Sequence, residues 1–324
     1  MTELVVVDAH TPQAAALESA ASLLRAGQLV AFATETVYGL GADATQAAAV
    51  AKIFAAKGRP QTNPLIAHVS SVQMARAWAG GWPAVADVLA DAFWPGPLTM
   101  IVPRTDRFAA AVSAGLETVG LRVPEPAVAR GLIAALGRPV AAPSANRSEH
   151  VSPTTAQHVV DDLQGQVAMV LDSGRTGVGI ESTVVDVSGE VPVLLRRGPI
   201  GEARLREVVG ALRVVDQRTD GTQRQASPGQ SVRHYAPDVP CIRVDEAFEA
   251  RDSDAVIAVG RSVPGAFVLS TPEVAARELY ALLRRLEARR VARIVVVMPP
   301  HEARWAAVRD RLLRATVLPP LPGP

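Results

Sequence analysis

Short runs of β-branched and other apolar residues alternate with longer Ala- and Leu-rich segments of helical period along most of the chain. This alternation predicts an α/β fold, in which helices cover a large sheet of mixed strand direction. The tight two-residue turns that an all-β sandwich needs are too few. We expect strands at residues 29–34, 64–69, 98–103, 119–123, 139–143, 168–172, 183–187 and 191–196. We expect helices at residues 12–26, 45–57, 71–79, 83–92, 125–136, 154–163 and 202–211.

The alternation is interrupted once, by a polar stretch at residues 216–240 that contains several Gly and Pro residues and has no period. Such a composition is typical of a linker. The pattern then restarts, with strands expected at 241–244, 255–260, 266–270 and 293–298 and helices at 272–290 and 302–314. A length of 324 residues also suits about two domains. We therefore predict a first α/β domain over 1–212, a linker over 213–240, and a small Rossmann-like βαβ domain with a parallel sheet over 241–324.

Charge and composition exclude several classes of protein. Lys and Arg number 33 and Asp and Glu 32, so the net charge of +1 gives no overall attraction to nucleic acid or membranes. Cys241 is the single cysteine, which excludes an intramolecular disulfide and a Cys-based zinc site. The N-terminus does not resemble a secretory signal, and no uncharged apolar run approaches the ~20 residues that span a bilayer. We expect a cytoplasmic protein without membrane contact.

The segment from Gly39 to Ala44 matches a loose form of the dinucleotide-binding fingerprint, between an expected strand and an expected helix. That fingerprint also needs an acidic residue about 20 positions later to hold the ribose. No Asp or Glu occurs between Ala44 and Ala86. The stretch instead contains Lys52, Lys57, Arg59, His68 and Arg76, which suit an anion. P-loop, HExxH, EF-hand and GxSxG motifs are absent from the sequence.

Polar side chains gather where the expected strands begin or end, which is where open α/β sheets bind ligands. They comprise Thr34–Gly39, Lys57–Pro60, Asn63, His68, Arg122, Ser144–Asn146, Glu181–Thr183 and Arg196–Arg197. This set suits an oligophosphate together with a small polar anion. It lacks the closely spaced carboxylates of a glycosidase or a two-metal nuclease.

Each of these residues also has a purely structural interpretation. Arg122 could pair with a buried Asp, and His68 could be a satisfied core histidine. Ser144 and Asn146 could cap helix or turn ends, and Asn63 before a Pro is typical of an ordinary turn. The functional interpretation is favoured because the structural interpretation would have to be correct for every one of these residues at once.

Seven segments in order resemble the threonylcarbamoyl-AMP synthases of the YrdC-type fold. They are TETVYGLG (34–41), KGRP with NPL (57–65), FWPGPLT (93–99), APSAN (142–146), SPT (152–154), GIESTVVD (179–186) and LRRGPI (195–200). The segment SPGQSVRHYAP (227–237) resembles the linker of the two-domain form. Glu149 stands where this family often has Gly, and Ala33 where it often has Pro. The resemblance covers essentially the whole chain and implies a twisted open sheet with a concave, basic cavity.

The resemblance implies that L-threonine, bicarbonate or CO2, and ATP are converted to threonylcarbamoyl-AMP and pyrophosphate. Mg²⁺ would be carried by the ATP phosphates, without dedicated protein ligands. Lys57 and Arg59 would be the catalytic residues. The threonine site would comprise Thr36, His68, Thr118, Arg122, Ser182 and, through its backbone, Ala142. The ATP site would comprise Lys57, Arg59, Asn63, Ser144, Asn146, Ser152, Arg196 and Tyr235, the last as part of a lid formed by the linker.

The implied partners are downstream tRNA threonylcarbamoyl transferase proteins, and direct contact with tRNA is possible but not required. Two other functions remain open from the sequence. One is a module that binds double-stranded RNA or tRNA, and the other is a carbamoyl transferase that acts on a different acceptor. Between residues 277 and 314 the chain carries ten Arg against four acidic residues. We interpret these arginines as a solvated helix face with intrahelical ion pairs, with an RNA-facing patch as the alternative.

Overall fold

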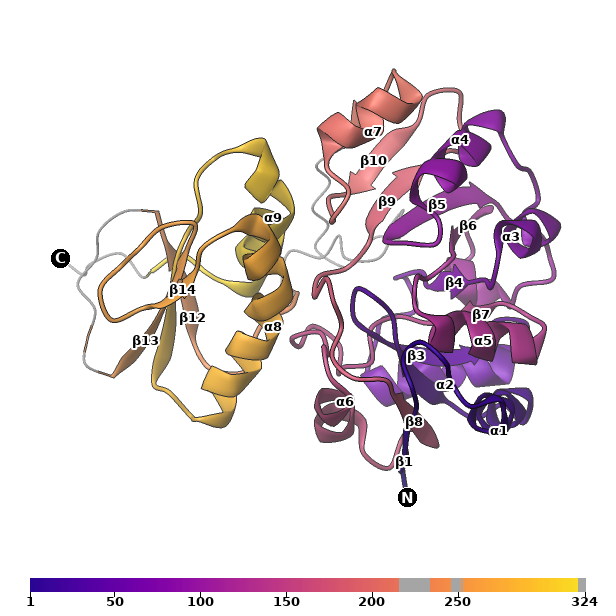
Figure 1. Ribbon diagram of the computed structural model, residues 1–324, viewed down its shortest axis with the longest axis horizontal. Helices are drawn as coiled ribbons and strands as arrows, with labels where there is room; N and C mark the ends of the chain where they lie inside the picture. Colours follow the sequence, from indigo (N-terminus) through magenta and orange to yellow (C-terminus); the bar gives the residue numbers. More distant parts are fainter. Residues whose placement is uncertain (216–233, 246–250, 252, 320–324) are drawn as a thin grey trace.

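The computed structural model describes residues 1–215, 234–245, 251 and 253–319. Their strands form two sheets, one of eleven strands in the order β1-β8-β2-β3-β7-β4-β6-β5-β9-β10-β11 and one of four strands in the order β12-β15-β13-β14. Figure 1 shows the two sheets in separate lobes, with α8 (Pro272–Ala288) and α9 (Ala306–Ala315) between them. Residues 216–233 of the expected linker lie outside the described residues. No helix among the described residues is long and apolar enough to cross a membrane.

The large sheet is mixed, as predicted. Its strands are β1 (Glu3–Val6), β2 (Val30–Ala33), β3 (Tyr38–Asp43), β4 (Ile66–His68), β5 (Leu98–Pro103), β6 (Thr118–Arg122), β7 (Val140–Ala141), β8 (Met169–Asp172), β9 (Thr183–Asp186), β10 (Val193–Arg196) and β11 (Arg213–Val214). All eight strands expected in this part of the chain are present, and β1, β3 and β11 were not predicted. Helices cover both faces of the sheet. They are α1 (Ala14–Arg25), α2 (Ala47–Lys57), α3 (Val72–Trp78), α4 (Ala84–Phe93), α5 (Ala127–Leu136), α6 (Ala156–Leu163) and α7 (Glu202–Val209), with a short 3₁₀ helix η1 (Ala110–Ser113).

The glycine-rich segment that begins at Gly39 forms β3, which pairs antiparallel with β2 and does not open a helix. A Cβ atom on Gly41 would come within 2.9 Å of side-chain atoms of Phe32 and Val140. Glycine is therefore needed for close packing and not for a phosphate-binding loop. This arrangement explains why the dinucleotide fingerprint lacks its acidic partner.

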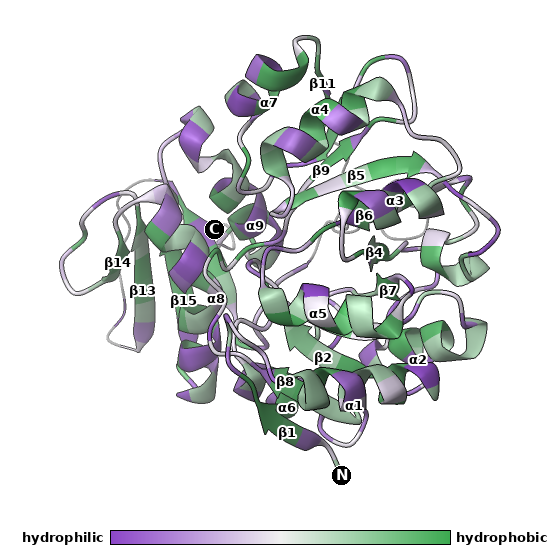
Figure 2. Ribbon diagram, turned by 45° about the vertical axis from the view of Figure 1, so that its right-hand side comes forward, coloured by the Kyte–Doolittle hydropathy of each residue, from purple (hydrophilic) through white to green (hydrophobic). Residues whose placement is uncertain are grey.

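Burial on both faces explains why the central strands are continuously apolar. In β2, Val30 and Phe32 face the core beneath α1 and α5, whereas Ala31 and Ala33 face the larger core beneath α2, α4 and α6. Figure 2 shows hydrophobic strands between helices that carry polar residues along their outer sides. The sheet is thus a rigid frame, and its strand ends position the site.

The small sheet is entirely parallel, as predicted, with strands β12 (Cys241–Val244), β13 (Asp254–Val259), β14 (Phe267–Leu269) and β15 (Arg293–Val297). The helix expected at 302–314 divides into a 3₁₀ turn, η2 (Ala303–Trp305), and α9. The core of this lobe extends across the junction, because Val37, Val151 and Ile180 of the first lobe belong to the same apolar cluster as residues of α8 and α9.

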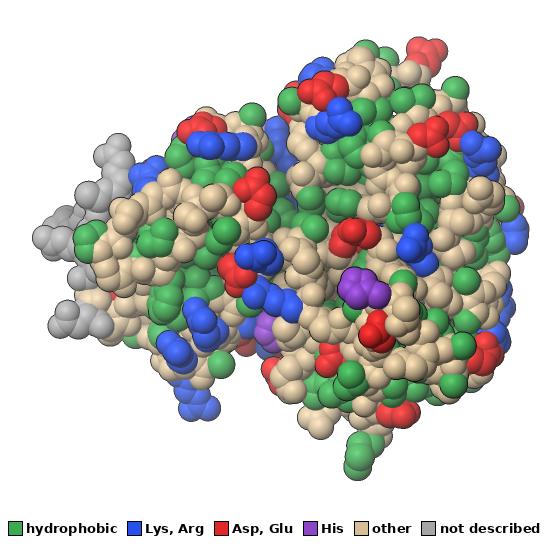
Figure 3. All heavy atoms as spheres, viewed as in Figure 1, with side chains coloured by type: hydrophobic (Ala, Val, Ile, Leu, Met, Phe, Trp, Pro, Cys, Tyr) green, Lys and Arg blue, Asp and Glu red, His purple; other side chains and the backbone are tan. Residues whose placement is uncertain are grey.

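The interpretation of the C-terminal arginines as a solvated face is wrong for three of them. Arg284, Arg311 and Arg314 are buried. Arg284 donates two hydrogen bonds to Asp162 on α6, and Arg311 pairs with Glu181 ahead of β9. Helical period identified an arginine-rich face but could not show that this face meets another domain. Figure 3 shows basic and acidic side chains close together along the junction of the lobes.

Candidate active site

A cavity of about 50 Å³ lies at the strand ends of the large sheet and is roofed by the last residues of the linker. Strands β4, β6 and β10 end at it, β9 begins beside it, and the turn between β2 and β3 forms one wall. The lining residues are Thr34, Thr36, Val37, Gly39, Arg59, Ile66, His68, Arg122, Ala142, Pro143, Ser144, Glu181, Ser182, Arg196, His234 and Tyr235. Segments more than 190 residues apart in the chain therefore contribute to one cavity.

Most side chains predicted for substrate binding meet in this cavity. Those that line it are Thr36, Arg59, His68, Arg122, Ala142, Ser144, Ser182, Arg196 and Tyr235. Four others are buried and do not line it: Lys57, Asn63, Asn146 and Ser152. Lys57, Asn63 and Ser152 each share a hydrogen bond with a lining residue, and Asn146 belongs to the same loop as Ser144. Thr118 lies apart, at the opposite end of β6 from Arg122 and roughly 13 Å away along the strand. It lines a separate small cavity with Ser113 and Leu116.

Arg122 ends β6 and reaches the turn between β2 and β3. Its Nη2 donates to Thr36 Oγ1 at 2.9 Å and lies 2.7 Å from Glu35 Oε1, and its Nε donates to Gly96 O at 3.3 Å. The Thr34 hydroxyl accepts hydrogen bonds from the backbone N–H groups of Thr36 and Val37 and so fixes the turn. Arg122 thus has the buried acidic partner that the structural alternative required, a Glu in place of an Asp. The same guanidinium lines the cavity, so the two interpretations hold together.

His68 is buried at the end of β4, beside Arg122. Burial and the nearby guanidinium lower the pKa of His68 to about 3, so its ring is neutral at physiological pH. Its Nδ1 has no hydrogen-bond partner among the described residues, as is also true of Asn63 Oδ1, Asn146 Oδ1 and His234 Nδ1. Buried polar atoms are normally paired, so the unpaired nitrogens of His68 and His234, which both line the cavity, indicate a place for a polar ligand.

Lys57 and Arg59 flank Gly58, which ends α2 in the left-handed conformation at φ +61°. Lys57 Nζ donates to the backbone oxygens of Ser144, at 2.6 Å, and Asn146. Arg59 donates to the backbone oxygens of Asn63 and Pro64. Burial, reinforced by the neighbouring Arg59, lowers the pKa of Lys57 well below its usual range. Burial likewise lowers the pKa of Arg59 to about 10. Both side chains would gain from an anion in the cavity.

Ser182 and Arg196 form the far wall. Arg196 Nε and Nη2 donate to the backbone oxygen and the hydroxyl of Ser182, each at 3.0 Å, and the Ser182 hydroxyl also contacts Thr99 Oγ1 at 2.8 Å. Asn146 uses its amide nitrogen to close the turn to His150, which is the capping role that its structural alternative described. Asn63 closes a turn back to Pro60 through its backbone N–H.

His234 and Tyr235 form the roof and come from the end of the linker. The Tyr235 ring is buried, stacks on Tyr280 of α8 at 5.6 Å between centroids, and lies 5.4 Å from the Arg311 guanidinium. His234 packs edge-on against Tyr235 at 4.0 Å. Burial lowers the pKa of His234 to about 3. The roof is therefore held by the C-terminal lobe.

Glu181 and His234 line the cavity but were given no ligand-binding role from the sequence. Glu181 was among the polar residues gathered at strand ends, and His234 was in the linker segment that resembles the family, directly before Tyr235. Thr34, Val37, Gly39, Ile66 and Pro143 also line the cavity without a predicted role. Glu181 is the one carboxylate that lines the cavity among the described residues. Burial would raise its pKa, but Arg311 and Arg196 outweigh burial and hold it at about 2.

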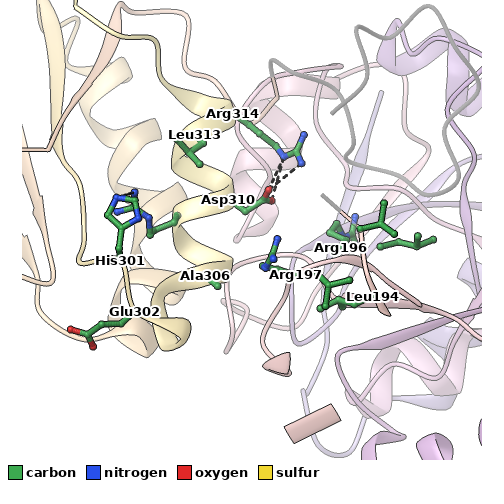
Figure 4. Close-up of a pocket in the computed structure, with 13 residues that line it drawn as sticks. Leu194, Arg196, Arg197, His301, Glu302, Ala306, Asp310, Leu313 and Arg314 are labelled. Atoms are coloured by element: carbon green, nitrogen blue, oxygen red, sulfur yellow. Dashed lines mark hydrogen bonds and ion pairs between the residues drawn. The ribbon is translucent and has the colours of Figure 1, made fainter. Parts of the chain in front are cut away.

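A second cavity of about 410 Å³ lies between the two lobes (Figure 4). Arg196 and Arg197 contribute from the end of β10, and Asp310, Leu313 and Arg314 from α9. Asp310 accepts a hydrogen bond from Arg314 at 3.0 Å. Arg196 lines both cavities, so the cleft between the lobes adjoins the wall of the smaller cavity.

Comparisons with known proteins agree with this architecture. A family model of the Sua5, YciO and YrdC proteins, described as "Telomere recombination", matches residues 22–198. A second model, described as the C-terminal domain of threonylcarbamoyl-AMP synthase, matches residues 200–317.

Relatives of similar length cover nearly the whole chain. The threonylcarbamoyl-AMP synthase of Bacillus subtilis is 38% identical in an alignment 320 positions long that covers 92% of each chain. That of Pyrococcus abyssi is 38% identical in an alignment 317 positions long that covers 92% of this chain and 93% of the relative. A crystal structure of P. abyssi Sua5 complexed with L-threonine superposes with a TM-score of 0.88 at 36% identity, covering 97% of this chain and 98% of that one. The chain therefore belongs to the Sua5/YrdC family of threonylcarbamoyl-AMP synthases.

Proposed function

We propose that the protein joins L-threonine, bicarbonate or CO2, and ATP into threonylcarbamoyl-AMP and pyrophosphate. The observation that carries the proposal is one buried cavity that is lined by Thr36 and Arg122 and also by Arg59 and Arg196. A guanidinium with a neighbouring hydroxyl suits an amino-acid carboxylate, and separate buried cations suit a triphosphate. The proposed compartment is the cytoplasm.

In the proposed reaction the threonine amine first takes up CO2, forming a carbamate and releasing a proton. A carbamate oxygen then attacks the α-phosphorus of ATP. The new O–P bond replaces the bond to the β-phosphate, and pyrophosphate leaves. No covalent enzyme intermediate is needed, so catalysis consists of positioning and of neutralising negative charge.

Lys57, Arg59 and Arg196 would supply that neutralisation around the phosphates. Lys57 would act partly through the Ser144–Asn146 loop, whose carbonyls it already holds. Threonine would lie against Thr36, Arg122 and Ser182, with His68 neutral beside it and the Ala142 backbone opposite. Thr118 is too far along β6 to contact the same molecule without a large rearrangement, so we leave it out of the proposed site.

Mg²⁺ would enter as part of the ATP substrate. Glu181, the carboxylate at the cavity among the described residues, is already engaged by Ser152, Tyr280 and Arg311. A metal ion on the phosphates would therefore complete its shell mainly with water.

Substrate entry requires the roof to move. Sites for ligands of this size typically measure about 300–1,000 Å³, whereas the cavity beneath Tyr235 holds about 50 Å³. His234 and Tyr235 would swing out for entry and return before reaction. The closed roof would keep water from the carbamate and from the mixed anhydride, both of which hydrolyse.

Pyrophosphate release tests the proposal, measured with Mg²⁺, ATP, threonine and bicarbonate and with each omitted in turn. Release that needs threonine and bicarbonate together is the expected result. Equal release with other amino acids would favour a carbamoyl transferase for a different acceptor. No release, together with tight and salt-dependent binding of duplex RNA or tRNA without ATP, would favour the RNA-binding module. The adenylate would pass to downstream tRNA threonylcarbamoyl transferase proteins, and tRNA contact by this chain is not required.

A further inference from the structure

We propose that Arg311 of the C-terminal lobe is a positioning residue of the active site, which holds Glu181 in the orientation that presents Ser152 to the nucleotide. The active-site cavity would then be complete only when α9 is docked. The proposal rests on the function proposed above, because it takes Arg196 to be an ATP contact, and it takes Ser152, which does not itself line the cavity, to contact ATP as the family resemblance implies.

Arg311 projects from α9 across the junction and is fully buried. Its Nε donates to Glu181 Oε2 at 2.8 Å and its Nη2 to the backbone oxygen of Glu181 at 3.3 Å. Its Nη1 donates to the backbone oxygen of Arg197 at 3.0 Å and to Asp310 at 2.7 Å. One planar guanidinium thus holds both the side chain and the backbone of Glu181, and also the chain just after Arg196. A single ammonium could not reproduce this fork.

Glu181 transmits the contact to the cavity. Its Oε1 accepts the Ser152 hydroxyl at 2.7 Å, while its Oε2 is shared by Arg311 and the Tyr280 hydroxyl at 3.0 Å. Glu181 also precedes Ser182, to which Arg196 is bonded. The orientation of one carboxylate therefore links a residue of the C-terminal lobe to the wall where ATP is proposed to bind.

Arg284, a buried arginine on α8, makes a less direct contact with the site. It binds Asp162 with both terminal nitrogens, at 2.8 and 3.1 Å, and also the backbone oxygen of Val151, and none of these three residues lines the cavity. Arg311 differs because its partner does line the cavity. A contact such as Arg284–Asp162 is sufficient to join the lobes. The contact of Arg311 with Glu181, a cavity residue, therefore points to a role in the site.

The test compares full-length Arg311→Met with wild type by the KM and kcat of pyrophosphate release and by the Kd of MgATP from calorimetry. We expect kcat/KM for ATP to fall at least tenfold, with the Kd for MgATP rising. Ser152→Ala should cost clearly less in the Arg311→Met background than in wild type, because the hydroxyl is already misplaced. Arg293→Met is the matched control. It breaks the Arg293–Asp254 pair inside the C-terminal lobe, so it should lower the melting temperature without changing KM. The effect of Ser152→Ala should be the same in the Arg293→Met background as in wild type.

Unchanged kcat/KM and Kd in folded Arg311→Met, or full additivity with Ser152→Ala, would overturn the proposal. If Arg311→Met does not fold, the same kcat/KM and Kd measurements are made on two replacement variants. One is Arg311→Lys, and the other is the double variant Arg311→Met/Glu181→Gln, which removes both charges. Wild-type Kd and kcat/KM in whichever of these folds would count against it. The ATP-binding measurement stays informative if wild type shows no threonine-dependent turnover, so the failure of the proposed function is distinguishable from the failure of this inference.

Discussion

The imidazole of His150 lies 3.0 Å, from Nε2 to Oε2, from the carboxylate of Glu287 on α8, across the junction of the two lobes. Its Nδ1 lies 3.1 Å from Asp162 on α6, so one buried ring bridges an acid from each lobe. Arg284 pairs with the same Asp162, and Asp238 at the end of the linker approaches the His150–Glu287 pair. Burial alone would lower the pKa of His150, but the hydrogen bonds to Asp162 and Glu287 outweigh burial and raise it.

This bridge predicts a pH-dependent junction. The raised pKa means that the folded protein binds the proton more tightly than the unfolded chain does. The stabilisation is therefore fully present below about pH 6.5 and is lost as pH rises through the folded pKa, by at most about 1.4 kcal/mol per unit of pKa difference. Urea unfolding of wild type and His150→Gln at pH 6.0 and 8.5 tests it. The stability gap between them should be wide at pH 6.0 and narrower at pH 8.5, and His10→Gln on an exposed loop is the control. A gap that does not change with pH would refute the bridge as a titrating element.

Replacing Arg59 by Ala should reduce kcat/KM for pyrophosphate release by about 100-fold or more. Loss of one preorganised donor to a developing anion typically has an effect of this size. The circular dichroism spectrum should stay native, because Arg59 contacts only backbone oxygens of its own loop among the described residues. Lys52→Ala is the matched control, since Lys52 is exposed on α2, the helix that ends just before Arg59, and its side chain hydrogen-bonds only Gly27 O among the described residues. A wild-type kcat/KM in Arg59→Ala would show that Arg59 does not stabilise the phosphates of ATP.

Glu149 has a φ of +64°, which is strained for any residue with a Cβ atom. Its side chain is exposed, while its backbone oxygen accepts the Ala236 N–H at 3.0 Å. Glu149→Gly should therefore stabilise the protein by roughly 0.5–1 kcal/mol, after allowing for the greater freedom of Gly in the unfolded chain. Chemical denaturation measures the gain. Glu207→Gly, at an exposed position on α7, should instead lose about 1 kcal/mol. A loss in both variants would contradict the strain argument.

Ending the chain after Val215 should leave a folded but less stable first lobe with at least tenfold lower turnover. The truncation removes Tyr235 and Arg311 and exposes Val151 and Ile180, which now pack against the C-terminal lobe. Melting temperature, circular dichroism and pyrophosphate release measure the three effects. Full activity of the folded fragment would make the C-terminal lobe an accessory domain.

The fold was largely predictable because its strands are buried on both faces and read as apolar runs. Three strands were missed, β1, β3 and β11. In β3, Gly39 and Gly41 hide the strand signal, although close packing of Gly41 against Phe32 is what requires glycine there. The cavity could be assembled from the sequence because polar residues at strand ends converge in an open α/β sheet. Thr118 entered the expected site only through the family resemblance, and it lies at the opposite end of β6 from Arg122.

The contacts between lobes were not predictable from local pattern. Arg284 and Arg311 lie on helices whose period identifies which residues share a face, but period does not indicate whether water or another domain covers it. Glu181 was among the polar residues expected at strand ends, but its pairing with Arg311 was not predicted, for a related reason. Its role depends on an arginine 130 positions later in the chain, and a pairing at that separation leaves no trace in a single sequence.

The small volume beneath Tyr235 has a kinetic consequence. In the proposed reaction, a roof that moves aside for ATP to enter would have to move aside again before the bulky adenylate could depart, so each turnover would include two roof motions besides the chemical step. The same roof motion would then set both how long the labile adenylate is retained and how fast the protein turns over. Tyr235 is held by α8 and α9, so a change that loosens the docking of these helices would also shorten the time for which the adenylate is retained.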